Sequence, residues 1–181
     1  MGVITKTAAN LWVFGYGSLI WRPGFAFAEK RLATVVGYRR RFCQASHDHR
    51  GTPDRPGRVV TLSPDSDSQC EGMAFKLEES VEDVLKLLDI REQDGYERQS
   101  LALTFRDGSI EQGVTWIAAK GNLSWRGGES IDEVVQLIAE RKGPSGSNRE
   151  YLFELQKALA EVKIADTYVD RLCHQVRLVV K

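Results

Sequence analysis

Residues 13 to 21 read Val-Phe-Gly-Tyr-Gly-Ser-Leu-Ile-Trp, and they form the most informative stretch of the chain. Together with Leu11 and Trp12, which precede it, the apolar start of this stretch is typical of a buried strand. Two glycines then flank one tyrosine. Glycine permits backbone torsions that other residues avoid, and it lets a ligand approach main-chain N–H groups closely. The stretch therefore predicts a strand that ends either in an anion or oxyanion cradle over Gly15–Leu19 or in a simple tight turn.

The composition is that of one globular domain with a sizeable core. Of the 181 residues, 42% are apolar and 28% are charged. Lysine plus arginine equals aspartate plus glutamate, so no basic surface for nucleic acid is expected. No apolar stretch approaches the roughly 20 residues that cross a membrane. We expect a flexible arm over residues 1–10, without the pattern of a secretory signal, and a single domain over 11–181.

The three cysteines, Cys43, Cys70 and Cys173, are odd in number, widely spaced and form no C-x-x-C pair. This usage is typical of a reducing compartment, so we expect a cytoplasmic protein without a disulfide framework or a zinc site. His47 and His49 could bind a metal in principle, but no third ligand of matching type lies at a suitable spacing, so no metal is expected.

The first half of the chain is rich in β-branched and aromatic residues, which favour strands. Most of the chain with the apolar spacing of helices comes later, and the pattern Ser-x-x-Glu at Ser130 and at Ser147 predicts two helix starts. Ser80 is a possible N-cap of an earlier helix. Strands followed by helices predict an α+β fold whose antiparallel or mixed sheet curls into a barrel. Strands are expected at 11–15, 33–43, 57–63, 70–77, 99–106 and 112–120, and helices at about 80–93, from 131, from 148 and at about 166–178.

Glu92 is an acid on the apolar side of the helix predicted over 80–93. At 100° per residue it lies within about 20° of Val81 and Leu85, which belong to the stripe that faces the core. It also falls in the last turn, where the helix dipole disfavours negative charge. Burial and the dipole both raise the pKa of a carboxyl group, which makes Glu92 a candidate general base or acid. A structural ion pair with an arginine is the alternative.

Two other functional patterns overlap the glycines. The run Gly15-x-Gly17 lacks the third glycine of a dinucleotide fingerprint, because Ile20 occupies that position and Pro23 follows where a helix should begin. A nicotinamide or flavin cofactor is therefore not expected. Ser18 is not in a G-x-S-x-G elbow, but it could act as a nucleophile if His47 or His49 reached it. 

Arg39, Arg40 and Arg41 fall within a predicted strand, so their side chains alternate between its two faces. An inward arginine could hold a substrate carboxylate with forked hydrogen bonds, and Arg39 is the residue that we name for this role. A solvated edge strand that carries charge is the alternative.

Four motifs in order resemble the ChaC-type γ-glutamylcyclotransferases. They are Phe14-Gly-Tyr-Gly-Ser-Leu-Ile-Trp21, Gly51-x-Pro53-x-x-Pro-Gly-Arg-Val-Val-Thr-Leu62, Arg91-Glu-x-x-Gly-Tyr96 and Gly143-Pro-Ser-Gly-x-Asn-x-Glu-Tyr-Leu-x-Glu-Leu155. The resemblance implies the γ-glutamylcyclotransferase-like fold, a small mixed β-barrel flanked by helices. It also implies a glutathione-specific enzyme that releases 5-oxoproline and Cys-Gly without a cofactor.

By position, the resemblance implies that Glu92 is the proton acceptor. It implies a substrate loop over Val13, Phe14, Gly15, Tyr16, Gly17, Ser18 and Leu19. Tyr151 is a further possible contact to substrate, as is Arg39. The residues leave two other functions open: a serine amidase of γ-glutamyl peptides that uses Ser18 with His47 or His49, and a non-catalytic module that binds γ-glutamyl compounds.

Overall fold

In residues 11–78 and 80–180, which the computed structural model describes, five strands form a closed barrel in the order β1-β3-β2-β4-β5. β1 pairs in parallel with β5 and closes the barrel, while the other neighbouring strands are antiparallel. The predicted α+β class with a mixed barrel is confirmed, and the expected arm at 1–10 lies outside the described residues. The barrel strands are β1 (Trp12–Gly15), β2 (Glu29–Ser46), β3 (Gly57–Lys76), β4 (Tyr96–Phe105) and β5 (Ile110–Ala118), and β6 (Lys142–Gly143) and β7 (Gly146–Ser147) form a separate two-stranded sheet.

β2 and β3 form a long antiparallel pair, and the prediction of two separate strands at 57–63 and 70–77 was wrong. The turn-forming residues from Ser63 to Ser68 lie inside β3, where Pro64 pairs opposite Tyr38. The register shifts between Val36 and Tyr38, at Gly37, whose φ is +84°. A bulge of this kind bends a strand without ending it, so pairing with β2 overrides the local preference for a turn.

The helices begin within one residue of their predicted starts. The predicted capping box is present, because Ser130 accepts from Glu133 N–H and the Glu133 carboxylate accepts from Ser130 N–H. Ser147 and Asp166 also cap with their side chains, whereas Ser80 has a left-handed backbone and its hydroxyl makes no capping bond. No helix among the described residues is long and apolar enough to cross a membrane. The helices are α1 (Val81–Arg91), α2 (Ile131–Glu140), α3 (Asn148–Glu161) and α4 (Thr167–Val179).

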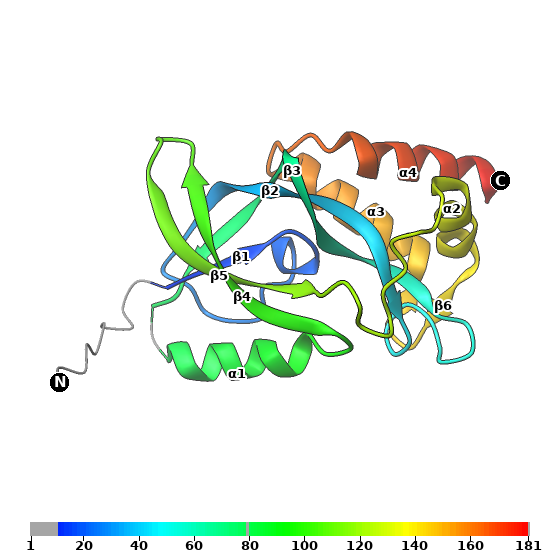
Figure 1. Cartoon of the computed structure of the whole chain (residues 1–181), viewed down its shortest axis with the longest axis horizontal. Coiled ribbons are helices and arrows are strands. Elements are labelled where there is room, and N and C mark those ends of the chain that lie inside the picture. The colour runs from blue at the N-terminus through cyan, green and yellow to red at the C-terminus, as the bar shows by residue number, and fades with distance from the viewer. Residues whose placement is uncertain (1–10, 79, 181) are drawn as a thin grey trace.

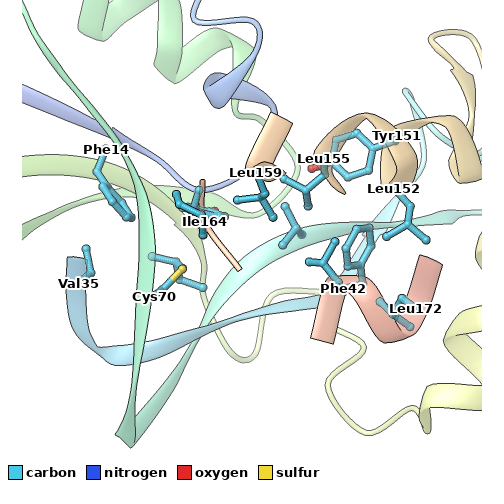
Figure 2. Packing of buried hydrophobic residues seen from close by; sticks show 14 of the residues in the cluster. Phe14, Val35, Phe42, Cys70, Tyr151, Leu152, Leu155, Leu159, Ile164 and Leu172 are labelled. Atoms are coloured by element: carbon cyan, nitrogen blue, oxygen red, sulfur yellow. The ribbon is translucent and has the colours of Figure 1, made fainter. Parts of the chain in front are cut away.

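α2, α3 and α4 pack on one another, and α2 and α3 also contact β3. Figure 1 shows this group of helices on one side of the barrel and α1 apart from it. One apolar cluster joins the two layers, with Phe14 and Val35 from the barrel and Leu155 and Leu172 from the helices, all of them buried (Figure 2). Burial of this apolar surface holds α3 against the barrel.

A second apolar cluster fixes α1 and the segment that follows β1. Leu88 of α1 is fully buried in a cluster with Val13, Leu19 and Trp116. Val81, Val84 and Leu85 of α1 pack half-buried against this cluster, whereas Leu87 and Ile90 are exposed. Leu19 belongs to a single 3-10 turn, η2 (Ser18–Ile20), which directly follows the two glycines. The end of α1 and the glycine-bearing segment are therefore anchored in the same cluster.

Candidate active site

A cavity of about 500 Å³ lies where the glycine-bearing segment, the end of α1 and the connection between β2 and β3 meet. These three walls come from positions that are far apart in the sequence, and α3 adds Tyr151. Its lining includes Tyr16, Gly17, Ser18, Leu19, Trp21, Arg22, His49, Arg50, Arg91, Glu92, Asp94, Tyr96 and Tyr151.

Only part of the predicted substrate loop lines the cavity. Tyr16, Gly17, Ser18 and Leu19 do so. Val13, Phe14 and Gly15 belong to β1, where the side chains of the first two are fully buried in the barrel. These three residues fix the direction in which the chain leaves the barrel and enters the loop.

The two glycines are needed because the segment folds tightly. A Cβ atom at Gly15 would lie 2.8 Å from Leu19 Cβ, and one at Gly17 would lie 2.8 Å from Val60 Cγ1 and 3.3 Å from Tyr151 Oη. Among the described residues, no acceptor is found for the N–H groups of Gly17, Ser18 and Leu19. Unpaired N–H groups at a cavity wall are available to a ligand oxygen.

Glu92 lies directly after α1, as its C-cap residue, and faces the same cavity. Its side chain is 20% exposed. Burial raises the pKa of the Glu92 carboxyl above its usual value, although the positive charges of Arg91 and His49 act in the opposite direction. The expected direction of the pKa shift is therefore confirmed. The helix ends one residue before Glu92, so the carboxyl is placed by the chain turning away from α1.

Three tyrosines lie near this carboxyl, the buried Tyr16 and Tyr151 and the half-buried Tyr96. Tyr16 donates to Trp116 O at 2.5 Å, and Tyr96 donates to Val60 O at 2.7 Å. Tyr151 packs at 5.8 Å from the Trp21 ring. Burial raises the pKa of each phenol, and the nearby Glu92 carboxylate raises it further. The phenols are therefore neutral near pH 7 and bring no competing charge to the cavity.

Arg39 does not line this cavity. Its side chain is half-exposed and pairs with Asp65 at 3.3 Å. The inward arginine is Arg40, which is buried, donates from Nε to Tyr16 O at 2.7 Å and forms an ion pair with Asp166. Arg40 therefore holds the glycine-bearing segment from behind, and the structure offers no geometric support for Arg39 as a substrate contact.

The histidines do not form a pair with Ser18. The Ser18 hydroxyl accepts from Arg91 Nη2 at 3.1 Å. His47 Nδ1 lies 2.9 Å from Asp94 Oδ2, and His49 Nδ1 lies 3.0 Å from Ser145 Oγ. Among the hydrogen bonds of the described residues, none joins Ser18 to a histidine, so the geometry gives Ser18 no general base.

Arg50 is a cavity residue that the sequence analysis missed. Its side chain is 8% exposed, yet it lines the cavity. Nη1 donates to Ser147 O at 3.2 Å and lies 3.5 Å from Glu150 Oε2, and the guanidinium lies 5.4 Å from the centre of the Tyr151 ring. A guanidinium that stacks on an aromatic ring and is hydrogen-bonded at one edge is suited to bind a carboxylate. The available signal was its position immediately before the Gly51 motif.

A closed barrel with a glycine-bearing loop that faces a half-buried glutamate defines a class of protein, and comparisons with known proteins identify it. The crystal structure of the yeast γ-glutamylcyclotransferase specific to glutathione superposes with a TM-score of 0.88 at 29% identity, over 94% of this chain and 96% of that one. The fold is thus the γ-glutamylcyclotransferase-like fold that the resemblance implies.

Sequence comparison assigns the family. The model of the ChaC-like protein family matches residues 11–179. Gamma-glutamylcyclotransferase 2-3 of Arabidopsis thaliana is 43% identical, over 92% of this chain and 88% of its own length. The glutathione-specific gamma-glutamylcyclotransferase of Saccharomyces cerevisiae is 31% identical, over 96% of this chain and 98% of its own length. The chain therefore belongs to the ChaC-like protein family.

Proposed function

We propose that this protein catalyses the intramolecular cyclotransfer of glutathione to 5-oxoproline and Cys-Gly, with Glu92 as the general base. The relatives named above carry this activity in their names, two of them with glutathione as the stated substrate. The observation that carries the proposal is one cavity lined both by a carboxyl group of raised pKa and by three residues whose N–H groups have no acceptor within 11–78 and 80–180.

The reaction needs a base more than it needs a protein nucleophile. The α-amine of a γ-glutamyl group can attack its own γ-carbonyl carbon, which closes a five-membered lactam. Only the neutral amine attacks, so Glu92 removes one proton from the α-ammonium group. The neutral amine forms the new C–N bond and gives up a second proton as it becomes the lactam N–H. The bond to the cysteinyl nitrogen breaks as Glu92 returns the first proton to that nitrogen, and the freed amine of Cys-Gly takes up the second proton. Tethering of the two reacting groups supplies a large effective molarity.

The remaining charges of the substrate have partners in the cavity. The tetrahedral intermediate carries an oxyanion, for which the N–H groups of Gly17, Ser18 and Leu19 are the candidate donors; one such donor contributes about 3 kcal/mol in comparable sites. Arg50 is our candidate for a substrate carboxylate, and Tyr16 and Tyr151 form walls of the same cavity.

The direct test is to incubate the purified protein with glutathione, and separately with γ-Glu-Ala, and to quantify 5-oxoproline. We expect 5-oxoproline and Cys-Gly in equal amounts from glutathione, and less product or none from γ-Glu-Ala. Calorimetry on the same samples measures binding. Glutathione that binds without forming 5-oxoproline over hours would instead indicate a non-catalytic binding module. An acyl-enzyme on Ser18, detected by mass spectrometry, would indicate an amidase.

A cytoplasmic location is part of the same proposal. Cys43, Cys70 and Cys173 are free thiols, and burial raises the pKa of each to about 11 or 12. Free thiols are the usual state in reducing compartments, where glutathione is itself kept reduced.

A further inference from the structure

Arg91, the last residue of α1, reaches from the helix to the glycine-bearing side of the cavity. Its Nη1 donates to the carbonyl oxygens of Arg22 at 2.6 Å and Pro23 at 3.0 Å. Its Nη2 donates to Ser18 Oγ at 3.1 Å. Its Nε lies 3.6 Å from Glu92 Oε1. All three nitrogen atoms of one guanidinium therefore face groups of the candidate active site.

Besides Ser18, Arg91 contacts the chain just after η2, at the carbonyl groups of Arg22 and Pro23. Among the described residues, the carbonyl groups of Arg22 and Pro23 accept no hydrogen bond from the backbone. Gly24, the next residue, has a φ of +75°, and a Cβ atom there would lie 3.1 Å from Arg91 Nη1. The absence of a side chain at Gly24 therefore leaves room for the Arg91 guanidinium. This fit on the far side of the cavity is independent of the contact between Arg91 and Glu92.

From this geometry we infer that Arg91 is a positioning residue, which holds Glu92 and the segment Ser18–Pro23 at a fixed separation across the cavity. The inference rests on the proposed function, because it assigns Arg91 a task in the same site. Arg91 acts through Glu92 and the segment, and it needs no contact with substrate. Lysine is a poor replacement, since a single ammonium group cannot meet acceptors in three directions as a planar guanidinium does.

The charge of Arg91 adds a second effect that an experiment can separate from the first. The guanidinium opposes the rise in the pKa of Glu92 that burial causes. The other groups around Glu92 are His49, from the connection between β2 and β3, and the neutral phenols of Tyr16, Tyr96 and Tyr151. Without the guanidinium, less opposes the effect of burial on the carboxyl, so Glu92 stays protonated to higher pH.

The test compares Arg91→Gln, Arg91→Lys and the control Arg98→Gln. Arg98 lies on β4 and pairs with Asp89 at 3.4 Å, outside the cavity. We expect kcat to fall roughly tenfold to a hundredfold in both Arg91 variants and to stay unchanged in Arg98→Gln. The acid limb of the kcat profile should move to higher pH in Arg91→Gln and much less in Arg91→Lys, which keeps the charge.

Hydrogen exchange provides a readout that needs no turnover. The N–H groups of Ile20, Trp21 and Arg22 are bonded within the segment, and they should exchange faster in both Arg91 variants than in the wild type. Arg91→Lys serves as the main variant if Arg91→Gln does not fold. Folded variants with kcat within twofold of wild type, or with an unmoved acid limb and unchanged exchange, would overturn the inference. A wild-type protein that forms no 5-oxoproline would instead reject the proposed function.

Discussion

At Glu92, burial and nearby positive charge have opposite effects on one carboxyl group. Burial is the larger effect, so the pKa of Glu92 in the folded protein exceeds the usual value of a glutamate. A raised pKa means that the folded state binds the proton more tightly than the unfolded state does. The stabilising contribution is therefore complete at low pH and is lost as pH rises through the folded pKa. Near neutral pH, the charged form of Glu92 therefore destabilises the fold. The proposed reaction gives a reason for a buried carboxylate at this position, because it needs a base there.

Replacing Glu92 with glutamine should separate stability from catalysis. Glu92→Gln keeps the shape and removes both the base and the buried charge. We expect 5-oxoproline formation to fall at least about 100-fold, while Tm at pH 7 stays equal or rises slightly. Quantification of 5-oxoproline checks the expected loss of activity, and thermal unfolding checks the expected Tm. Glu97→Gln, at an exposed position of β4, is the matched control. Near-wild-type turnover in Glu92→Gln would reject the general base.

The pH dependence of turnover should report the same carboxyl group. Because the base must be deprotonated, kcat should decline as pH falls through the raised pKa of Glu92, and the decline should begin above the usual range for a glutamate. A kcat profile between about pH 4 and pH 8 measures this limb. An acid limb at the usual pKa of a glutamate would contradict the assignment, as would the same limb in the residual activity of Glu92→Gln.

At the scale of elements, the site depends on how η2 and α1 approach each other. β1 delivers the chain to η2, the buried Leu19 anchors that turn beside Leu88 of α1, and Arg40 holds the Tyr16 carbonyl from behind. The glycines permit this approach, since side chains at their positions would meet neighbouring atoms. The short turn is therefore set by packing on several sides more than by its own hydrogen bonds.

Gly17→Ala should displace η2 from the end of α1. Its Cβ would lie 2.8 Å from Val60 Cγ1 and 3.3 Å from Tyr151 Oη, so the segment or the buried Val60 side chain must shift. We expect kcat/KM to fall about 100-fold and the free energy of unfolding to drop by about 1–3 kcal/mol. Gly128→Ala is the control, because a Cβ atom there has no neighbour within 4 Å. Equal kcat/KM in the two variants would show that the tight approach at Gly17 is dispensable.

At the scale of the whole molecule, the barrel and the helical layer must stay together for Tyr151 to reach the cavity. Asn148, the first residue of α3, joins the two layers: its Oδ1 accepts from Arg58 N–H at 2.6 Å, and its Nδ2 donates to Arg58 O at 2.7 Å. The Arg58 side chain donates to both carboxylate oxygens of Glu129, which precedes α2. One asparagine thus pairs with the backbone of β3 as a neighbouring strand would.

Asn148→Ala should loosen the attachment of α3 to the barrel. The change leaves two buried backbone groups of Arg58 unpaired, which costs about 1–3 kcal/mol for each group. We expect the free energy of unfolding to fall by about 2–4 kcal/mol, as measured by urea unfolding, and KM to rise because Tyr151 is one turn along the same helix. The exposed Gln136→Ala of α2 is the control. A loss below about 0.5 kcal/mol would contradict the role of Asn148.

Sequence patterns predicted the helices, the barrel class and the two walls of the cavity formed by Glu92 and by Tyr16–Leu19. These patterns failed where the structure of a segment depends on contacts with a distant segment. The turn residues around Pro64 predicted a break that pairing with β2 prevents, and the run of arginines pointed to Arg39 where Arg40 is the inward residue. The bulge at Gly37 shifts the register just before these arginines, so simple alternation along the strand was an unreliable guide.

The amino-acid sequence by itself determined the helix starts, the tight glycine-bearing segment and an acid at the end of an apolar helix. Each of these follows from residues within a few positions of one another, through spacing, capping and backbone freedom. Only the tertiary structure decided that Arg91 spans to Arg22 and Pro23, that Arg50 enters the cavity and that Ser18 lacks a histidine. These outcomes depend on distances between residues far apart in the chain, and barrel closure and side-chain packing set those distances.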